Sequence, residues 1–234
     1  MAWAPDRVAE EDWLRWTGVT GSSIQFPSPA TSPLPSLLRR RVTALGQAAL
    51  RCAWHMPVLS DALLIAASRH GEYSRTLAIL EGLVAGEPVS PADFTLSVHH
   101  ALIGLLSIAA ENQDGHTAVA AGADSFAFGL VEAAACLAER PGRPVILVYY
   151  DEALPQPFDR FNIREQQPLA LALALVSSGE RESFSVAGRP NPGGKDDDES
   201  QAEAFIRFLL AGDAARSLAS ERYIWEWRRH VAAA

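Results

Sequence analysis

Lysine and cysteine are almost missing from this chain of 234 residues. Lys195 is the only lysine, so arginine carries nearly all of the positive charge, and the formal net charge is −8 at pH 7. A chain with this balance is not drawn as a whole to nucleic acid or to an anionic membrane surface. The two cysteines, Cys52 and Cys136, lie far apart inside apolar stretches. They indicate no disulfide framework and favour a reducing, cytoplasmic location.

Several other features are missing, and each absence argues against a class of protein. No apolar run approaches the ~20 residues that a membrane-spanning helix needs. The first residues, MAWAPDRVAEEDW, carry acids where a signal peptide has a basic start and an apolar run. No CxxC pair and no His/Cys cluster has the spacing of metal ligands. We therefore expect no membrane span, no nucleic-acid partner, no metal and no cofactor.

The chain does have the apolar content of an ordinary globular protein. Hydrophobic residues make up 48% and charged residues 21%, and a chain of this length buries a substantial core without covalent staples. We find no internal repeat. The sequence therefore predicts one domain over residues 1–234, in which 189–200 is a solvated loop and 201–234 holds a final helix and an aromatic tail.

Segments of strand and helix character alternate along the middle of the chain. Buried strands are expected at 61–71, 116–123, 140–152 and 168–176, with 182–188 as a neighbour of the last one. Helices are expected at 37–54, 72–87, 99–112, 125–139 and 201–219. Because strands alternate with helices, the predicted fold class is α/β, with a mixed, mostly parallel sheet and helices on both faces.

The stretch SPADFTLSVHHALIGLLSIA, residues 90–109, has the layout of a nucleophile site. Ser90 and Pro91 form a good helix start, and residues 94–98 are expected to be extended. A helix that is apolar on nearly every side follows directly, and such a helix is expected to lie buried in the core. A helix N-terminus stabilises an anion, so α/β enzymes often place a reactive Ser or Cys at such a junction. Here the junction reads VHHA (98–101).

Three stretches resemble a known family: SRHGE (68–72), SPADFTLSVHHALIGLLSIA, and HTAVAAGADSFAFGLVEA (116–133). Together they resemble β-ketoacyl synthases of the thiolase-like fold. More closely, they are similar to the short β-ketoacyl-synthase-like proteins, called chain length factors, of bacterial aryl polyene and xanthomonadin-type pigment clusters. The AWAP start, the PxLLRRR phrase and the Trp-rich tail fit that short family as well. The resemblance is clearest over residues 1–160 and implies a thiolase-like half-fold.

The chain departs from an active synthase in two ways. In that family the nucleophilic cysteine is followed three residues later by Gly or Ser; Gly104 suits the later position, so Ala101 stands where the cysteine would be. An alanine side chain has no atom that attacks a thioester. The two histidines for decarboxylation come from a second half, and the roughly 75 residues left here are too few to form one. The resemblance therefore implies that this chain alone does not catalyse Claisen condensation.

What the resemblance implies instead is a non-catalytic subunit that pairs with an active ketosynthase as a heterodimer. The pair would extend a chain held on an acyl carrier protein in polyene or fatty-acid-like biosynthesis, and this subunit would shape the acyl tunnel. We name as pocket or tunnel candidates His99, His100, Ala101, Leu102, Ile103, Gly104, Leu105 and Leu106. Candidates for contact with the partner or the carrier protein are Arg39, Arg40, Arg41, Arg69 and His70, since arginine pairs well with carboxylates.

Other interpretations of the same residues remain open. The arginine cluster is also typical of a solvated helix start, and both histidines of the HH pair are also typical packing residues. Because His99 and His100 are adjacent, they are expected to point in different directions.

One alternative function is a small acyl-thioester hydrolase or transferase that uses His99 or His100 as a base. Another is a self-associating scaffold that binds carrier protein. The isolated chain is also a candidate homodimer, and the tail with Trp225 and Trp227 is either a packing lid or an interface anchor.

Overall fold

The structure, a computed structural model, describes residues 1–7, 9–18, 34–162, 166–177 and 183–231. Its helices are α1 (Glu10–Thr17), α2 (Ser36–Arg39), α3 (Ala44–Trp54), α4 (Tyr73–Val84), α5 (Pro91–Ser97), α6 (His100–Ala109), α7 (Ser125–Glu139) and α8 (Gln201–Ala211). Its strands are β1 (Ala2–Trp3), β2 (Leu63–Ala67), β3 (His116–Val119), β4 (Val145–Asp151), β5 (Leu169–Leu175), β6 (Ser183–Pro190), β7 (Ala215–Ala219) and β8 (Tyr223–His230). Short 3₁₀ turns lie at Leu59–Asp61, Gly122–Asp124 and Asp159–Phe161.

A mixed five-stranded sheet forms the centre of the molecule. Its strand order is β1-β5-β4-β2-β3, with β2 parallel to β3 and β4, and β5 antiparallel to β4 and β1. All seven residues of β4 are buried, which explains its nearly continuous apolar sequence, since a strand covered on both faces loses the polar alternation. The α/β class and the mixed sheet predicted from the sequence are confirmed.

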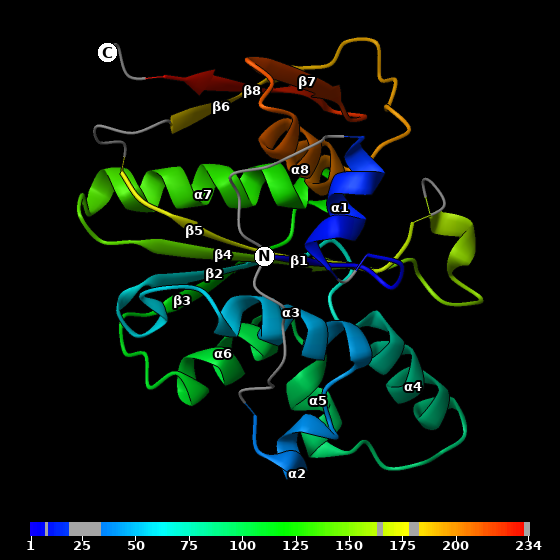
Figure 1. Cartoon of the computed structure of the whole chain (residues 1–234). Helices are drawn as coiled ribbons and strands as arrows, with labels where there is room; N and C mark the ends of the chain where they lie inside the picture. The colour runs from blue at the N-terminus through cyan, green and yellow to red at the C-terminus, as the bar shows by residue number, and fades with distance from the viewer. Residues whose placement is uncertain (8, 19–33, 163–165, 178–182, 232–234) are drawn as a thin grey trace.

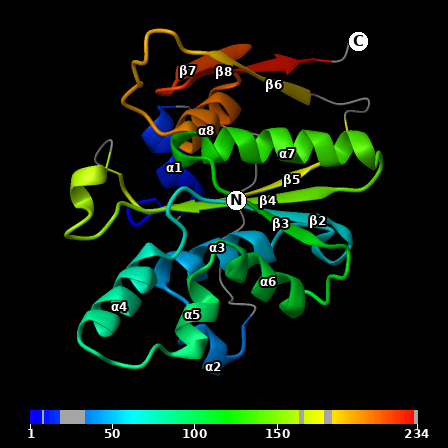
Figure 2. The same cartoon turned by 180° about the vertical axis from the view of Figure 1, so that it is seen from behind.

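Helices cover both faces of this sheet (Figures 1 and 2): α1, α7 and α8 lie on one side, and α3 to α6 on the other. Successive strand residues therefore enter different cores, because their side chains alternate. Ile65 packs in the core with α7 and α8, whereas Leu64 packs in the core with α3 and α6. Gly129 lets α7 approach closely, since a Cβ atom there would lie 2.9 Å from the Cβ of Ala67.

A second, antiparallel sheet of order β6-β8-β7 covers the outer side of α7 and α8 (Figure 1). The side chains of Trp225 and Trp227 on β8 are 2% and 0% exposed, so the aromatic tail is a packing element and not an exposed anchor. The prediction that 182–188 pairs with the strand at 168–176 is wrong. Phe184 on β6 packs edge-on against Phe205 of α8, and an alternating pattern alone does not identify which sheet a strand joins.

Three other sequence-based boundaries are corrected. The helix predicted at 201–219 ends at Ala211, because Gly212 adopts a left-handed conformation with φ 71°, and residues 215–219 form β7. The helix predicted at 37–54 is two helices. Thr43 begins the second of them, and its side chain accepts a hydrogen bond from the backbone N–H of Gly46. The loop expected at 189–200 begins only after Pro190, where β6 ends.

The extended segment predicted at 94–98 is helical. The Ser90 hydroxyl caps α5 by accepting a hydrogen bond from the N–H of Asp93, and the helix continues to Ser97. Phe, Thr and Val favour strands, but a strand needs a neighbour to pair with, and no described strand pairs with this segment. The cap at Ser90 therefore decides its local structure. The axes of α5 and α6 meet at 98°. The two together have the length and apolar character of a membrane span, but no single described helix does.

Candidate partner interface

Strand β3 leaves one side of the five-stranded sheet open. The N–H of Leu64 donates to the Gly115 carbonyl at 3.3 Å, and the N–H of Ser68 donates to the Val119 carbonyl at 3.2 Å. Because backbone groups alternate along a strand, those of His116 and Ala118 point away from β2. No described strand pairs with that side. An edge of this kind is a template for a strand from another chain.

One side of α6 carries apolar side chains that are not fully buried. Ala101, Leu105 and Ile108 recur at i, i+4 and i+7 and so share one side of the helix. Ala101 and Leu105 are half-buried, and Ile108 is 77% exposed. The expectation that α6 is buried all round is therefore wrong on this side. Apolar side chains that stay open to solvent are typical of a protein–protein contact.

The remaining apolar candidates of α6 point into this chain's own core. Leu102, Ile103 and Leu106 are 5%, 2% and 1% exposed and pack with α3 and β2. Ala101 is the second residue of α6, directly after the corner with α5. Arg41 lines a small crevice with Leu96, Ala101, Leu102 and Leu105. The structure thus brings together candidates that are sixty residues apart in the sequence.

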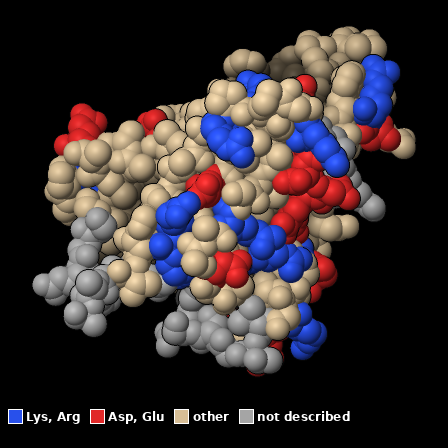
Figure 3. Space-filling view, turned by 90° about the horizontal axis from the view of Figure 1, so that it is seen from above, with Lys and Arg blue, Asp and Glu red and all other residues tan. Residues whose placement is uncertain are grey.

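The charged surfaces differ between the two ends of the molecule. Arg39 lies at the end of α2 and Arg40 and Arg41 in the following turn, and all three are exposed on the helical side opposite the three-stranded sheet. The face above the three-stranded sheet interleaves basic and acidic side chains (Figure 3), as in the ion pair between Arg228 and Glu226. Arg39, Arg40 and Arg41 therefore stay candidates for contact with an acidic partner.

His99 and His100 diverge, as their adjacency predicts. The ring of His99 covers Gly71, where a Cβ would lie 3.2 Å from it, and its Nε2 is 3.4 Å from the Arg69 carbonyl. The backbone carbonyl of His99 accepts a hydrogen bond from the Tyr150 hydroxyl at 3.2 Å. His99 thus holds the α5–α6 corner against the turn after β2. His100 points toward β3 and is exposed.

Arg69 and His70 follow β2 but face different surroundings. The backbone N–H of His70 donates to Asp151 Oδ1 at 3.1 Å, and its ring Nδ1 donates to the Glu152 carbonyl at 3.1 Å. Burial raises the pKa of the Asp151 carboxyl, while His70 beside it opposes that shift. Arg69 lines an open cavity of about 780 Å³ with Val119 at the end of β3. Of the two, Arg69 therefore lies nearer the open edge, and His70 has contacts typical of a structural turn.

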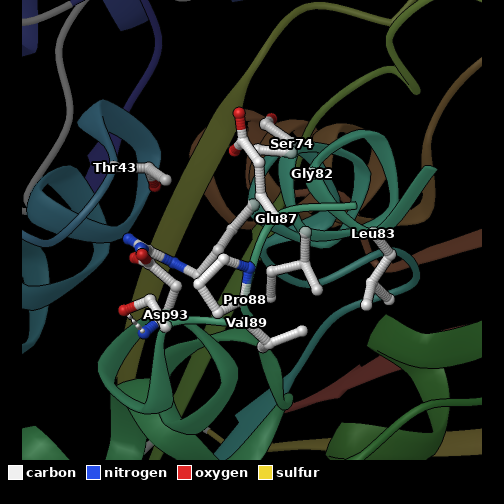
Figure 4. Close-up of a pocket in the computed structure, with 12 residues that line it drawn as sticks. Thr43, Ser74, Gly82, Leu83, Glu87, Pro88, Val89 and Asp93 are labelled. Atoms are coloured by element: carbon white, nitrogen blue, oxygen red, sulfur yellow. Dashed lines mark hydrogen bonds and ion pairs between the residues drawn. The ribbon is translucent and has the colours of Figure 1, made fainter. Parts of the chain in front are cut away.

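A second cavity, which the sequence did not predict, lies between α4 and α5 (Figure 4). Its volume is about 450 Å³, and Leu83, Pro88 and Val89 form its apolar wall. At its polar end Arg75 pairs with Asp93 at 2.5 Å. No residue of α4 is fully buried, and Leu83 is 52% exposed. An apolar stripe on a helix is usually a sign of burial; here it marks a helix that packs mainly on α5 and stands away from the core.

The stability of this helical corner is expected to depend on the ionisation of Glu72, at the start of α4. Its carboxylate accepts a hydrogen bond from Thr43 Oγ1 at 2.7 Å and lies 3.9 Å from an Arg75 nitrogen. Burial raises the Glu72 pKa above its ordinary value of 4.5. The folded state therefore holds a proton that the unfolded chain releases, so this stabilisation is present below about pH 4.5 and is lost as pH rises through the folded pKa.

A Glu72→Gln variant is expected to lose this pH dependence, because the amide keeps the shape and does not titrate. Urea unfolding of both proteins between about pH 4.5 and pH 7 measures it, with the wild-type unfolding free energy falling relative to that of the variant as pH rises. A wild-type curve that runs parallel to the variant curve, or rises relative to it, would contradict the expectation. An Asp159→Asn variant, which changes an exposed acid, is the control.

The structure thus places a mixed sheet between two layers of helices, with His100 and Ala101 at the start of α6. Residues 13–228 match the family described as beta-ketoacyl synthase, N-terminal domain, and the chain belongs to that family. The resemblance found in the sequence is thus confirmed. No relative is found among curated proteins.

Two solved structures have this fold over almost the whole chain. One is described as a ketosynthase (ApeO) in complex with its chain length factor (ApeC) from Xenorhabdus doucetiae. It is 26% identical with a TM-score of 0.80, and the match covers 97% of this chain and 95% of that one. The other is described as the ishigamide ketosynthase/chain length factor, with 10% identity, a TM-score of 0.68, and coverage of 99% and 98%. The second likeness supports the fold alone.

Proposed function

We propose that this chain is a chain length factor, a non-catalytic ketosynthase-like subunit that pairs with an active β-ketoacyl synthase. The observation that carries the proposal is the open edge of β3 beside an α6 that begins with His100 and Ala101 and offers no nucleophile. The likeness to a structure of a ketosynthase with its chain length factor supports it, and the matched chain has nearly the same length as this one. In this proposal a strand of the partner pairs with β3, and another part of the partner covers the apolar side of α6 that carries Ala101, Leu105 and Ile108.

The alternative of a thioester hydrolase or transferase has little support from the contacts. The Ser97 hydroxyl donates to the Phe94 carbonyl at 2.8 Å and not to a histidine. The ring of His99 contacts a backbone carbonyl, and no hydroxyl or thiol of the described residues is hydrogen-bonded to a ring nitrogen of His99 or His100. Burial raises the pKa of the Cys52 thiol to about 11, so that thiol is inert near neutral pH.

In this proposal the residues that shape the acyl tunnel lie on the partly open side of α6, which carries Ala101, Leu105 and Ile108. Leu102, Ile103 and Leu106 fill the core of this chain, so their part is to hold the helix in place. Ala101 and Leu105 lie at the crevice beside Arg41 and are free to contact a partner and its bound acyl chain. The substrate in this proposal is an acyl chain on a carrier protein, and the exposed arginines Arg39 to Arg41 suit the acidic surface of such a protein.

Co-expression with an active ketosynthase tests the assignment. Size-exclusion chromatography is expected to give a heterodimer, and extension of a carrier-bound acyl chain is expected only when both proteins are present. A stable homodimer that ignores the synthase and binds carrier protein would favour the scaffold alternative. Turnover of acyl thioesters by the isolated chain, lost in His99→Ala or His100→Ala, would favour the enzyme alternative.

Leu105→Ala in the reconstituted pair tests the tunnel role within the same assay. Shortening this side chain opens space next to the partner, so we expect longer products or a broader length distribution with an intact heterodimer. Leu83→Ala, which changes an exposed leucine on α4, is the matched control. Unchanged product length and yield for Leu105→Ala would exclude the wall role.

A further inference from the structure

Two of the six histidines differ from the rest in their contacts. The ring nitrogens of His55, His70 and His99 lie 2.9, 3.1 and 3.4 Å from backbone carbonyl oxygens. The His230 ring bonds to the Ser185 hydroxyl at 2.9 Å. No described residue makes a hydrogen bond to a ring nitrogen of His100 or His116. These two rings instead face each other.

The pair is formed by two different elements at the open side of the sheet. His100 begins α6 and His116 begins β3, and their ring centroids are 4.5 Å apart with planes inclined at 45°. Gly104 lies one helical turn after His100, and the ring of His116 packs beside it: a Cβ at Gly104 would be in ordinary contact with His116 Cε1, at 3.8 Å. Both residues are exposed to solvent. The pair is thus accessible and its two rings lie against one helical groove.

The chemistry of this pair suits a metal ion. Neutral imidazole is the form of histidine that binds a metal ion. Divalent zinc, copper and nickel bind imidazole nitrogen, at about 2.0–2.1 Å for zinc. The close approach of the two rings places two such ligands side by side at one point of the surface.

We propose that His100 and His116 form a two-histidine site for a divalent transition-metal ion of the copper, zinc and nickel group. Among the described residues no cluster of three or more His, Cys, Asp or Glu is placed to hold a metal. In this proposal water fills the remaining coordination positions, as in an open site and unlike a closed structural zinc site. Affinity is expected to follow the general order for nitrogen ligands, with copper binding more tightly than nickel or zinc.

Copper binding by the isolated, tag-free chain tests the proposal. After treatment with a chelator, titration with Cu²⁺ is expected to load one ion per chain, with electron paramagnetic resonance couplings from two imidazole nitrogens. The amino terminus is a common competitor for Cu²⁺, but here the Met1 amine is buried and donates to the Ala172 carbonyl at 2.7 Å. Zn²⁺ and Ni²⁺ are expected to raise the melting temperature by about 5 °C at a hundredfold excess over the dissociation constant.

The variants make the test specific to this pair. His100→Gln and His116→Gln should each lower Cu²⁺ affinity at least tenfold and leave the coupling of a single imidazole. Both positions are exposed, so the fold is expected to persist, and circular dichroism checks it. His55→Gln and His230→Gln are the matched controls and should bind as the wild type does. Wild-type affinity in the double variant His100→Gln/His116→Gln, or no two-nitrogen signal in the wild type, would overturn the proposal. Neither result would bear on the proposed partner, because the isolated chain is used.

Discussion

An Ala118→Pro variant is expected to remain folded on its own and to lose its association with the ketosynthase. The N–H of Ala118 points away from β2, so proline removes no hydrogen bond of this chain's own sheet. It does remove the donor that a partner strand would use, and its ring occupies the same space. Leaving the partner's carbonyl without a donor costs about 1–3 kcal/mol, and the steric clash adds to this, so we expect at least about hundredfold weaker binding.

Thr117→Pro is the matched control for this experiment. Its N–H points toward β2, so proline there breaks the internal ladder and should destabilise the isolated chain. Urea unfolding of the isolated variants and size-exclusion chromatography of the co-expressed pairs separate the two effects. Normal heterodimer formation by a folded Ala118→Pro variant would show that the partner does not pair with β3, and the proposed interface would be wrong.

The strands of the central sheet were predictable because a strand that is buried on both faces has an apolar sequence. The run at 145–150 is apolar at every position, and PLALALALV alternates leucine with alanine, so both segments read as strands covered on two faces. The composition of a segment does not predict the direction of its strand or the strand with which it pairs. β5 turned out antiparallel to β4, and β6 joined a different sheet. Strand pairing depends on contacts between distant segments, which a local pattern does not contain.

The candidate site was predictable only in part. The sequence alone places Ala101 at the position of the family's nucleophilic cysteine, because the surrounding motif is long enough to align with that family. An alanine side chain has no nucleophilic atom. Ala101 lies close to Arg41 because a turn separates α2 from α3. The sequence pattern predicts one continuous helix there, so it does not predict this contact. The pairing of His100 with His116 crosses from a helix to a strand. No spacing rule for metal ligands on one element detects a pair of this kind.

Asp124→Ala is expected to destabilise the chain by about 3–5 kcal/mol, the cost of leaving buried partners of a charged group unsatisfied. The Asp124 side chain is 1% exposed and accepts hydrogen bonds from Gln201 Nε2 at 2.9 Å and from the Trp225 indole at 2.8 Å. Arg222 also approaches it at 3.3 Å. This one carboxylate therefore joins the start of α7 to α8 and to β8.

Because Asp124 links α7 and α8 to the three-stranded sheet, its removal also bears on the prediction of a single domain. We expect one cooperative unfolding transition in urea for the wild type, followed by tryptophan fluorescence, and a lower midpoint with the same slope for the variant. Glu226→Ala is the matched control, since Glu226 lies on β8 next to Trp225 and pairs only with the exposed Arg228, a contact worth less than about 1 kcal/mol. Equal losses in the two variants would contradict the linking role of Asp124. A separate, earlier transition in Asp124→Ala would instead show that β6, β7 and β8 unfold as a unit of their own once this contact with α7 and α8 has gone.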